Sequence, residues 1–554
     1  MMKVISALLS LICAALPALA QDSRASIRDR VFMSAQAAQS STAGKALAQA
    51  ATRIAAGSAG LAMLLRERQD TADALDVMND RLAGAALESG AASDRTIAAL
   101  RTRIAEARAQ LSALDQDLDA RFPDFRELTN PAALSREEVQ SILRPGEALV
   151  MSFTDQEFFY AWAISRDQAD WFRQEIKRDD IADRVQALRA QLSANADNRG
   201  GVSLKRAARG DVRPFDRTLA HQLYADLFAP LEHVFAATDH VMMVLDGPLT
   251  SLPPAVLVTE APKGADDSAV ALRDTAWLLR RHALTTLPSV SALKALRRAG
   301  AVAKRSESNQ AFVGFGNPLL GYRLMADAGT VATTGREVVT RGVYDDVTRV
   351  ADLSPLPNTA NELQALAATM GVDDRALYLG ANATEANVKS ADLSKARILA
   401  FATHGLLVDG LPGLDEPALV FTPPAQPSAQ DDALLKASEA AQLNLSASLV
   451  ILSACDTAGS DGTPGSEGLS GLARAFIYAG ARAILVSHWP VDDYAASVLT
   501  TGMLERMQAA DPQGRAEALR QSALAILDDS SDARFAHPRI WAPFVVVGEG
   551  GLDG

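Results

Sequence analysis

Hydrophobic and polar positions follow two different rhythms along the chain, one up to about residue 122 and another from about residue 135. The first part is rich in alanine, has no proline between Ser26 and Phe122, and places apolar residues three and four positions apart. The second part alternates short, continuous apolar runs with longer amphipathic stretches. This change of rhythm predicts helices followed by an α/β region with a mainly parallel sheet.

The N-terminal part is predicted to form two helices, separated by a break of small and polar residues at 88–93. Apolar residues of the second helix recur at spacings of three and four without a miss, which is typical of a coiled-coil seam. They are Ile97, Leu100, Ile104, Ala107, Leu111, Leu114 and Leu118. We therefore expect an α-helical hairpin within residues 21–134. It either packs on the rest of the chain or binds a protein partner.

Nine apolar runs after the hairpin predict strands. They are Ala148–Phe153, Phe158–Ile164, His240–Leu245, Ala311–Gly314, Ile398–Ala402, Ala418–Phe421, Leu449–Ser453, Ala483–Ser487 and Pro543–Val547. A polar linker at 304–309 divides them into two α/β halves, which we place at residues 135–305 and 306–554.

The first twenty residues resemble a signal peptide. Lys3 supplies a positive charge, Val4–Leu16 is apolar, and a small-x-small site ends at Ala20. The alternative is an uncleaved membrane anchor, but about thirteen apolar residues are fewer than the roughly 20 that span a bilayer. We expect cleavage before Gln21, export to the periplasm or the extracellular space, and no stable membrane anchor afterwards.

The composition and net charge of the chain exclude one class of binding partner. The chain has 554 residues, of which 48% are hydrophobic, and a formal net charge of -13. It is large enough for more than one core, and it lacks the basic surface that nucleic-acid binding normally needs, so we expect no nucleic-acid partner.

Cysteine is used only twice, at Cys13 within the leader and at Cys455. A lone cysteine in an exported chain cannot form an internal disulfide, so Cys455 is either a buried filler or a reactive thiol. The strand run "LVILSAC" ends with Cys455, and the strand run "RILAFATHG" ends with His404 followed by glycine. Because the carboxyl ends of parallel strands meet at one edge of a sheet, the two side chains should lie together there.

A histidine and a cysteine so placed suit acyl transfer. The thiolate is the attacking species, and a neighbouring imidazole can take up the thiol proton and return it to the leaving amine. Gly405 has no side chain to shield its backbone N–H, which together with the Cys455 N–H would hold the developing oxyanion. The simpler interpretation of Gly405 is an ordinary turn glycine.

Other site chemistries lack a matching pattern. No histidine belongs to an H-E-x-x-H helix or to a cysteine pair, so no metal site is predicted. The segment "GLSGL" misses the G-x-S-x-G nucleophile motif by one residue. The segment "GFGNPLLG" lacks the spacing of a dinucleotide-binding loop, and we expect no cofactor.

Taken together, these motifs resemble the CHAT peptidases, which are caspase-like cysteine proteases of the same clan as caspases and separases. The resemblance covers about residues 135–554. It rests on "FATHG", on "LSACDTAGSDGTPGSEGLSGLARAFIYAGARAILVSHWPVDD", on "HPRIWAPFVVVGEG" and on the upstream blocks "LDGPLTSLPPAVL", "TLPSVSAL", "GFGNPLL" and "LPNTANEL".

The resemblance implies a caspase-like α/β/α sandwich whose N-terminal half is degenerate and non-catalytic. It also implies His404 as the general base and Cys455 as the nucleophile. Two positions depart from the family pattern. Thr457 is followed by Ala458 rather than glycine, and His488 stands where the family usually has leucine.

The segment "SHWPVDD" predicts a substrate pocket, because it follows the next strand after the cysteine and should reach the same sheet edge. The carboxylates of Asp492 and Asp493 would favour a basic residue before the cleaved bond, and the segment resembles the separase stretch that recognises arginine. The alternative is that both aspartates only cap the following helix.

The sequence therefore predicts an exported cysteine endopeptidase that hydrolyses peptide bonds of a protein or peptide substrate through a thioester. The alternative is a non-catalytic CHAT-like module that binds protein partners and leaves Cys455 unused.

Overall fold

The computed structural model of the chain describes most residues from 21 onward. The described residues are 21–39, several positions between 64 and 78, 91–121, 133–192, 213–303, 310–320, a few between 350 and 356, 358–406, 414, 416–428, 431–453, 471–489, 491 and 493–551. The expected signal peptide at 1–20 and the boundary expected between 305 and 306 lie outside them.

One sheet of eleven strands forms the centre of the molecule, in the order β3-β2-β1-β4-β5-β14-β13-β12-β8-β6-β7. The strands are β1 (Glu147–Thr154), β2 (Phe158–Ser165), β3 (Ala169–Glu175), β4 (His240–Val244), β5 (Ala283–Thr286), β6 (Gln310–Pro318), β7 (Leu377–Gly380), β8 (Ala396–Ala402), β12 (Leu449–Leu452), β13 (Ala483–Ser487) and β14 (Phe544–Gly548). All nine predicted runs lie on strands of the structure.

Strand direction divides this sheet into two halves. In the C-terminal half, β7, β6, β8, β12 and β13 are all parallel. In the N-terminal half, β1, β4 and β5 are parallel to one another, and β2 and β3 extend the sheet as an antiparallel meander. The two halves run in opposite directions and meet at β14, which is parallel to β5 and antiparallel to β13.

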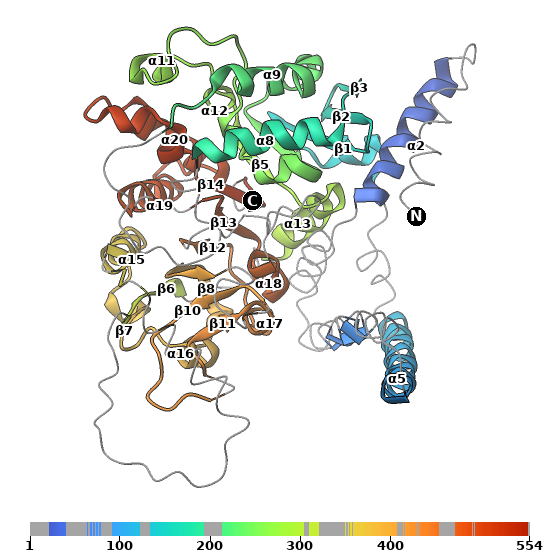
Figure 1. Cartoon of the computed structure of the whole chain (residues 1–554), viewed down its shortest axis with the longest axis vertical. Coiled ribbons are helices and arrows are strands. Elements are labelled where there is room, and N and C mark those ends of the chain that lie inside the picture. The colour runs from blue at the N-terminus through green and yellow to red at the C-terminus, as the bar shows by residue number, and fades with distance from the viewer. Residues whose placement is uncertain are drawn as a thin grey trace.

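Helices cover both faces of the sheet. They are α2 (Gln21–Gln39), α5 (Ala91–Arg121), α7 (Arg136–Ile142), α8 (Arg178–Leu192), α9 (Arg217–Leu227), α10 (Glu232–Phe235), α11 (Ala269–Arg273), α12 (Leu278–Arg281), α13 (Val290–Ala303), α15 (Asn358–Thr369), α16 (Glu385–Ser390), α17 (Ala437–Ala440), α18 (Gly471–Ala479), α19 (Asp493–Gln508), α20 (Arg515–Asp528) and α21 (Pro538–Trp541). Figure 1 shows α15, α19 and α20 on one side of the strands, and α13, α17 and α18 on the other.

The residues of β8 show why the sheet needs two helical layers. Ile398, Ala400 and Ala402 belong to the core under α8, α15 and α19, whereas Leu399 and Phe401 belong to the opposite core under α13 and α18. Successive side chains of a strand point to opposite faces, so a continuous apolar run requires cover on both. This arrangement confirms the predicted α/β/α sandwich.

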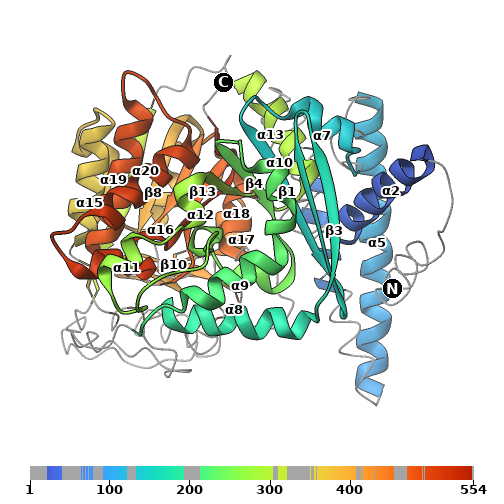
Figure 2. The same ribbon diagram turned by 90° about the horizontal axis from the view of Figure 1, so that it is seen from above.

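The N-terminal helices are arranged in two ways. Helix α2 packs on the β1–β3 end of the sheet, where both views place it (Figure 1, Figure 2). Phe32 is buried against Trp162, and the side-chain amide of Gln36 exchanges hydrogen bonds of 2.8 and 3.0 Å with the backbone of Leu134.

Helix α5 lies apart from the sheet and faces the helical positions between 64 and 78. Its least exposed side chains include Ile104, Ala107 and Leu114, which belong to the predicted seam. The N-terminal region is therefore helical, and α2 is in addition part of the α/β body.

Candidate functional site

His404 stands where β8 leaves the large sheet. The apolar run of β8 ends at Ala402, and the chain continues through Thr403 and His404 into the short strand β9 (Gly405–Leu406). Strand β9 pairs with β10 (Ala418–Val420), which pairs with β11 (Leu434–Lys436), and these three form a small second sheet. His404 therefore lies at the junction of the two sheets. Its side chain is partly buried there.

The backbone of His404 is held by the small sheet. The N–H of Val420 donates a hydrogen bond of 2.9 Å to the carbonyl oxygen of His404. The sequence did not predict this contact, because it joins residues that are distant in the chain and only β10 itself had an apolar signal.

Gly405 lies in a strand, rather than in the turn that the simpler interpretation placed there. It is opposite Leu419 of β10. Because Val420 donates to His404, the neighbouring pair of Gly405 and Leu419 is the non-hydrogen-bonded kind, in which the N–H points away from the partner strand. The Gly405 N–H is thus not taken up by β10, as an oxyanion contact requires.

Strand β12 brings the cysteine segment to the same edge. It is parallel to β8, with Leu449 opposite Ile398 and Leu452 opposite Phe401. The pairing continues past the strand, since the N–H of Ser453 donates to the carbonyl of Phe401 at 2.9 Å. Cys455 itself lies outside the described residues, two positions after Ser453. The predicted meeting of the two strand ends is confirmed up to that point.

The predicted pocket segment follows β13, which is parallel to β12. Asp492 and the side chain of Asp493 lie outside the described residues. The backbone of Asp493 is the first residue of α19. An aspartate at the first residue of a helix suits the positive end of the helix dipole.

Two contacts fix this segment from the side of β14. Trp489 is 1% exposed, and its indole N–H donates to the carbonyl of Arg539 at 2.9 Å. The N–H of His488 donates to the carbonyl of Pro543, also at 2.9 Å. His488 and Trp489, directly after β13, are therefore held against the residues before β14.

His488 couples this edge to the N-terminal half. Its carbonyl accepts a hydrogen bond of 3.1 Å from the guanidinium of Arg189 in α8, which also donates to the carbonyl of Ser251. The imidazole is 4% exposed, and its Nδ1 has no hydrogen-bond partner. Burial, with a smaller effect from the charge of Arg189, lowers the pKa of His488 from 6.5 to about 3. His488 is therefore neutral at pH 7.

A group of charged side chains supports the small sheet from the side of α16. Glu385 bonds to Lys389 at 2.5 Å and accepts the N–H of Asp432 at 2.8 Å, just before β11. Lys389 also contacts Glu439 at 2.6 Å, and Lys436 contacts Asp432 at 2.6 Å. Burial raises the pKa of Glu385, although the charge of Lys389 opposes this. These pairs fix the start of β11.

Among the described residues, no three His, Cys, Asp or Glu side chains gather in a way that would hold a metal ion. None of the helices in the described part of the chain is both long and apolar enough to cross a membrane.

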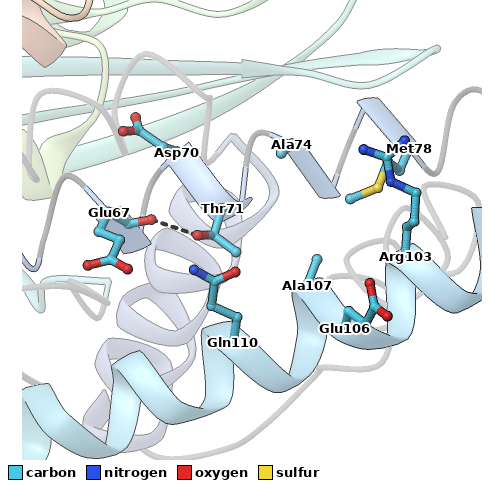
Figure 3. A pocket seen from close by; sticks show the side chains of 9 residues that line it. All are labelled: Glu67, Asp70, Thr71, Ala74, Met78, Arg103, Glu106, Ala107 and Gln110. Carbon is cyan, nitrogen blue, oxygen red and sulfur yellow. Dashed lines mark hydrogen bonds between the residues drawn. The ribbon is translucent and has the colours of Figure 1, made fainter.

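A groove lies between α5 and the helical positions 64–78 (Figure 3). Carboxylates, a guanidinium and small apolar side chains share its walls. These lining residues are Glu67, Asp70, Thr71, Ala74, Met78, Arg103, Glu106, Ala107 and Gln110.

Fold and edge together define an α/β protein with a histidine and a cysteine segment at the ends of adjacent parallel strands. The CHAT domain matches residues 217–549, which is more than half of the chain. The chain belongs to the CHAT domain family, and the resemblance drawn from its motifs is confirmed.

Curated relatives include tetratricopeptide repeat protein 28 of Homo sapiens, 26% identical over 388 residues, which are 63% of this chain and 14% of the relative. The protein of the same name from Mus musculus is 30% identical over 225 residues, which are 35% of this chain and 9% of the relative. The chain therefore spans only a small part of the relatives it matches.

A similar solved structure is the separase–securin complex of Saccharomyces cerevisiae. It is 10% identical with a TM-score of 0.40, over 83% of this chain and 34% of that one.

The buried imidazole predicts a pH dependence of stability. The unfolded chain protonates His488 near pH 6.5, whereas the folded chain does so only near pH 3. The contribution of the neutral imidazole is therefore complete above pH 6.5 and is lost as the pH falls toward 3. At pH 5 this loss amounts to about 2 kcal/mol.

Replacing His488 with leucine should therefore flatten the fall in unfolding free energy between pH 8 and pH 5, measured by urea denaturation. His233→Leu, which removes an exposed imidazole 3.4 Å from Asp170, is the control for the loss of a histidine side chain. An unchanged slope in His488→Leu would show that this imidazole is not held neutral.

Proposed function

We propose that the chain is a cysteine endopeptidase in which Cys455 attacks the peptide carbonyl and His404 transfers the proton. The observation that carries the proposal is the parallel pairing of β8 with β12, whose ends are level through the contact of Ser453 with Phe401. His404 follows one of these strands and Cys455 the other.

The proposed reaction has two stages. The Cys455 sulfur bonds to the carbonyl carbon as its proton passes to His404, and the tetrahedral intermediate then expels the amine, which takes that proton. The product is a thioester on Cys455. A water molecule, deprotonated by His404, attacks the thioester, and the acid leaves as the sulfur regains a proton.

Backbone donors would stabilise the oxyanion of both stages. Gly405 supports this role, because its N–H is left free of β10 by the alternation of the small sheet. The backbone N–H of Cys455 would be the second donor. It belongs to the same residue as the attacking sulfur, so it would lie close to the substrate carbonyl that the sulfur attacks.

Removing either side chain tests the dyad. Cys455→Ala and His404→Ala should each lower the turnover of peptide substrates at least about 10³-fold, because groups that act as a unit fail together. Urea midpoints should stay close to wild type, and Cys13→Ser should keep full activity. Unchanged turnover in either alanine variant would remove that residue from the mechanism.

We further propose that the pocket beside Cys455 accepts a basic side chain, arginine above all. Asp493 begins α19, and Trp489 and His488, which follow β13, are held by contacts to Arg539 and Pro543. A carboxylate in this position would engage a guanidinium with two hydrogen bonds.

Matched peptides with arginine, lysine, aspartate or leucine before the scissile bond test this specificity. Asp493→Asn should lower the preference for arginine over leucine about ten- to a hundredfold, since a charge-assisted hydrogen bond is lost. Asp511→Asn removes the same charge beyond the other end of α19 and should change nothing. A preference for leucine or aspartate in the wild type would reject Asp493 as the specificity residue.

The proposed place of action is outside the cytoplasm, because residues 1–20 have the pattern of a cleaved leader. Mass spectrometry of the exported chain should find an N-terminus at Gln21. A chain retained in the cytoplasm with its leader intact would contradict this.

A second candidate is a non-catalytic module that binds protein partners. The groove between α5 and the helical positions 64–78 favours it, since it offers a surface separate from the proposed site. The curated relatives are also named for their repeats rather than for a reaction. Absence of peptide turnover in the purified wild type, together with binding of a protein partner that substitutions in this groove abolish, would favour this candidate.

A further inference from the structure

We propose that Thr403 is a positioning residue that fixes His404 through a hydroxyl contact with Val420. This inference rests on the proposed function and adds to it a residue to which no role has been assigned. The position of the general base would then depend on the contact between Thr403 and β10.

Thr403 and His404 are tied to the same residue from two sides. The hydroxyl of Thr403 donates a hydrogen bond to the carbonyl oxygen of Val420. The N–H of Val420 in turn donates to the carbonyl of His404 at 2.9 Å. One residue of β10 therefore holds two consecutive residues at the point where the chain leaves β8.

The contact is buried, which raises its importance. Thr403 is 3% exposed and Val420 is fully buried. Water cannot replace the threonine hydroxyl there, so its loss leaves the Val420 carbonyl short of a donor. The chain between Ala402 and Gly405 would then have one hydrogen bond fewer to hold it.

Val420 is itself a fixed point. The next residue, Phe421, packs edge-to-face on Phe401 with the ring centroids 6.4 Å apart. Phe401 lies two positions before Thr403 in β8. Three contacts therefore join residues 401–404 to residues 420–421: the packing of the two rings, the hydroxyl hydrogen bond of Thr403 and the backbone hydrogen bond of His404.

Proton transfer depends strongly on such placement. A displacement of about 1 Å at a reacting group can cost about a hundredfold in rate. The hydroxyl of Thr403 does not touch the substrate in this arrangement, so its removal should affect the transfer step rather than binding. The expected signature is a lower kcat with an unchanged KM.

Four variants of the full chain, in a Cys13→Ser background, separate this role from general stability. Thr403→Val and Thr403→Ala should lower kcat about tenfold with KM within about twofold, and Thr403→Ser should restore kcat. Thr259→Val is the matched control. It removes a largely buried hydroxyl that donates to the carbonyl of Ala276 at 3.0 Å, in the connection between β4 and β5. It should leave kcat unchanged.

A second measurement does not require turnover. The rate of Cys455 alkylation by iodoacetamide, followed from pH 5 to pH 9, reports how well an imidazole assists the thiolate. Thr403→Val should shift this profile toward that of His404→Ala, and Thr259→Val should not.

The possible outcomes distinguish a failure of the Cys455/His404 dyad from a failure of the positioning role of Thr403. If His404→Ala leaves the alkylation profile unchanged, the proposed dyad fails. If His404→Ala changes it but Thr403→Val does not, only the positioning role fails. The same holds if Thr403→Ser loses as much kcat as Thr403→Val, or if Thr259→Val loses as much.

Discussion

Strand β14 is hydrogen-bonded on both sides, to β5 in parallel and to β13 in antiparallel orientation. It is the last strand among the described residues, and it joins two half-sheets that run in opposite directions. Its register sets Ser487 opposite Phe544, which places the segment with His488 and Trp489 against the residues before β14. The edge at which β8, β12 and β13 end is therefore shaped by residues that arrive only at the end of the chain.

A buried ionic network fixes the other end of β14. Arg297 of α13 bonds to Glu147 at 2.7 Å and to Glu549 at 3.1 Å, and all three side chains are largely or fully buried. Burial alone would raise the pKa of Glu147, but the imidazole of His240, 3.9 Å away, and the charge of Arg297 lower it to about 2. The network thus holds the first strand, a helix of the N-terminal half and the C-terminal strand together.

The sequence predicted those elements whose signal is local. Runs such as Leu449–Leu452 and Ala483–Val486 are apolar throughout because both faces of the sheet are covered, and the sequence predicts them as strands. Strands β3, β5 and β7 of the large sheet were missed, and so were the short strands β9 and β11 of the small sheet. The polar residues of β3 and the four-residue lengths of β5 and β7 give little signal, and pairing with neighbours defines them instead.

The same difference between local and long-range signals decides how much of the candidate site the sequence predicts. The strand ends that carry His404 and Cys455 follow from parallel topology, whereas the contacts of Thr403 and Arg189 join segments distant in the chain.

The central claim is that Cys455 forms a thioester that His404 helps to make and to break. Acid quenching during turnover of an arginyl ester, followed by peptide mapping with mass spectrometry, tests it most directly. The account predicts an arginyl adduct on Cys455 that accumulates within the first turnover and is absent from His404→Ala. Turnover without an adduct on Cys455, or an adduct on another residue, would contradict it.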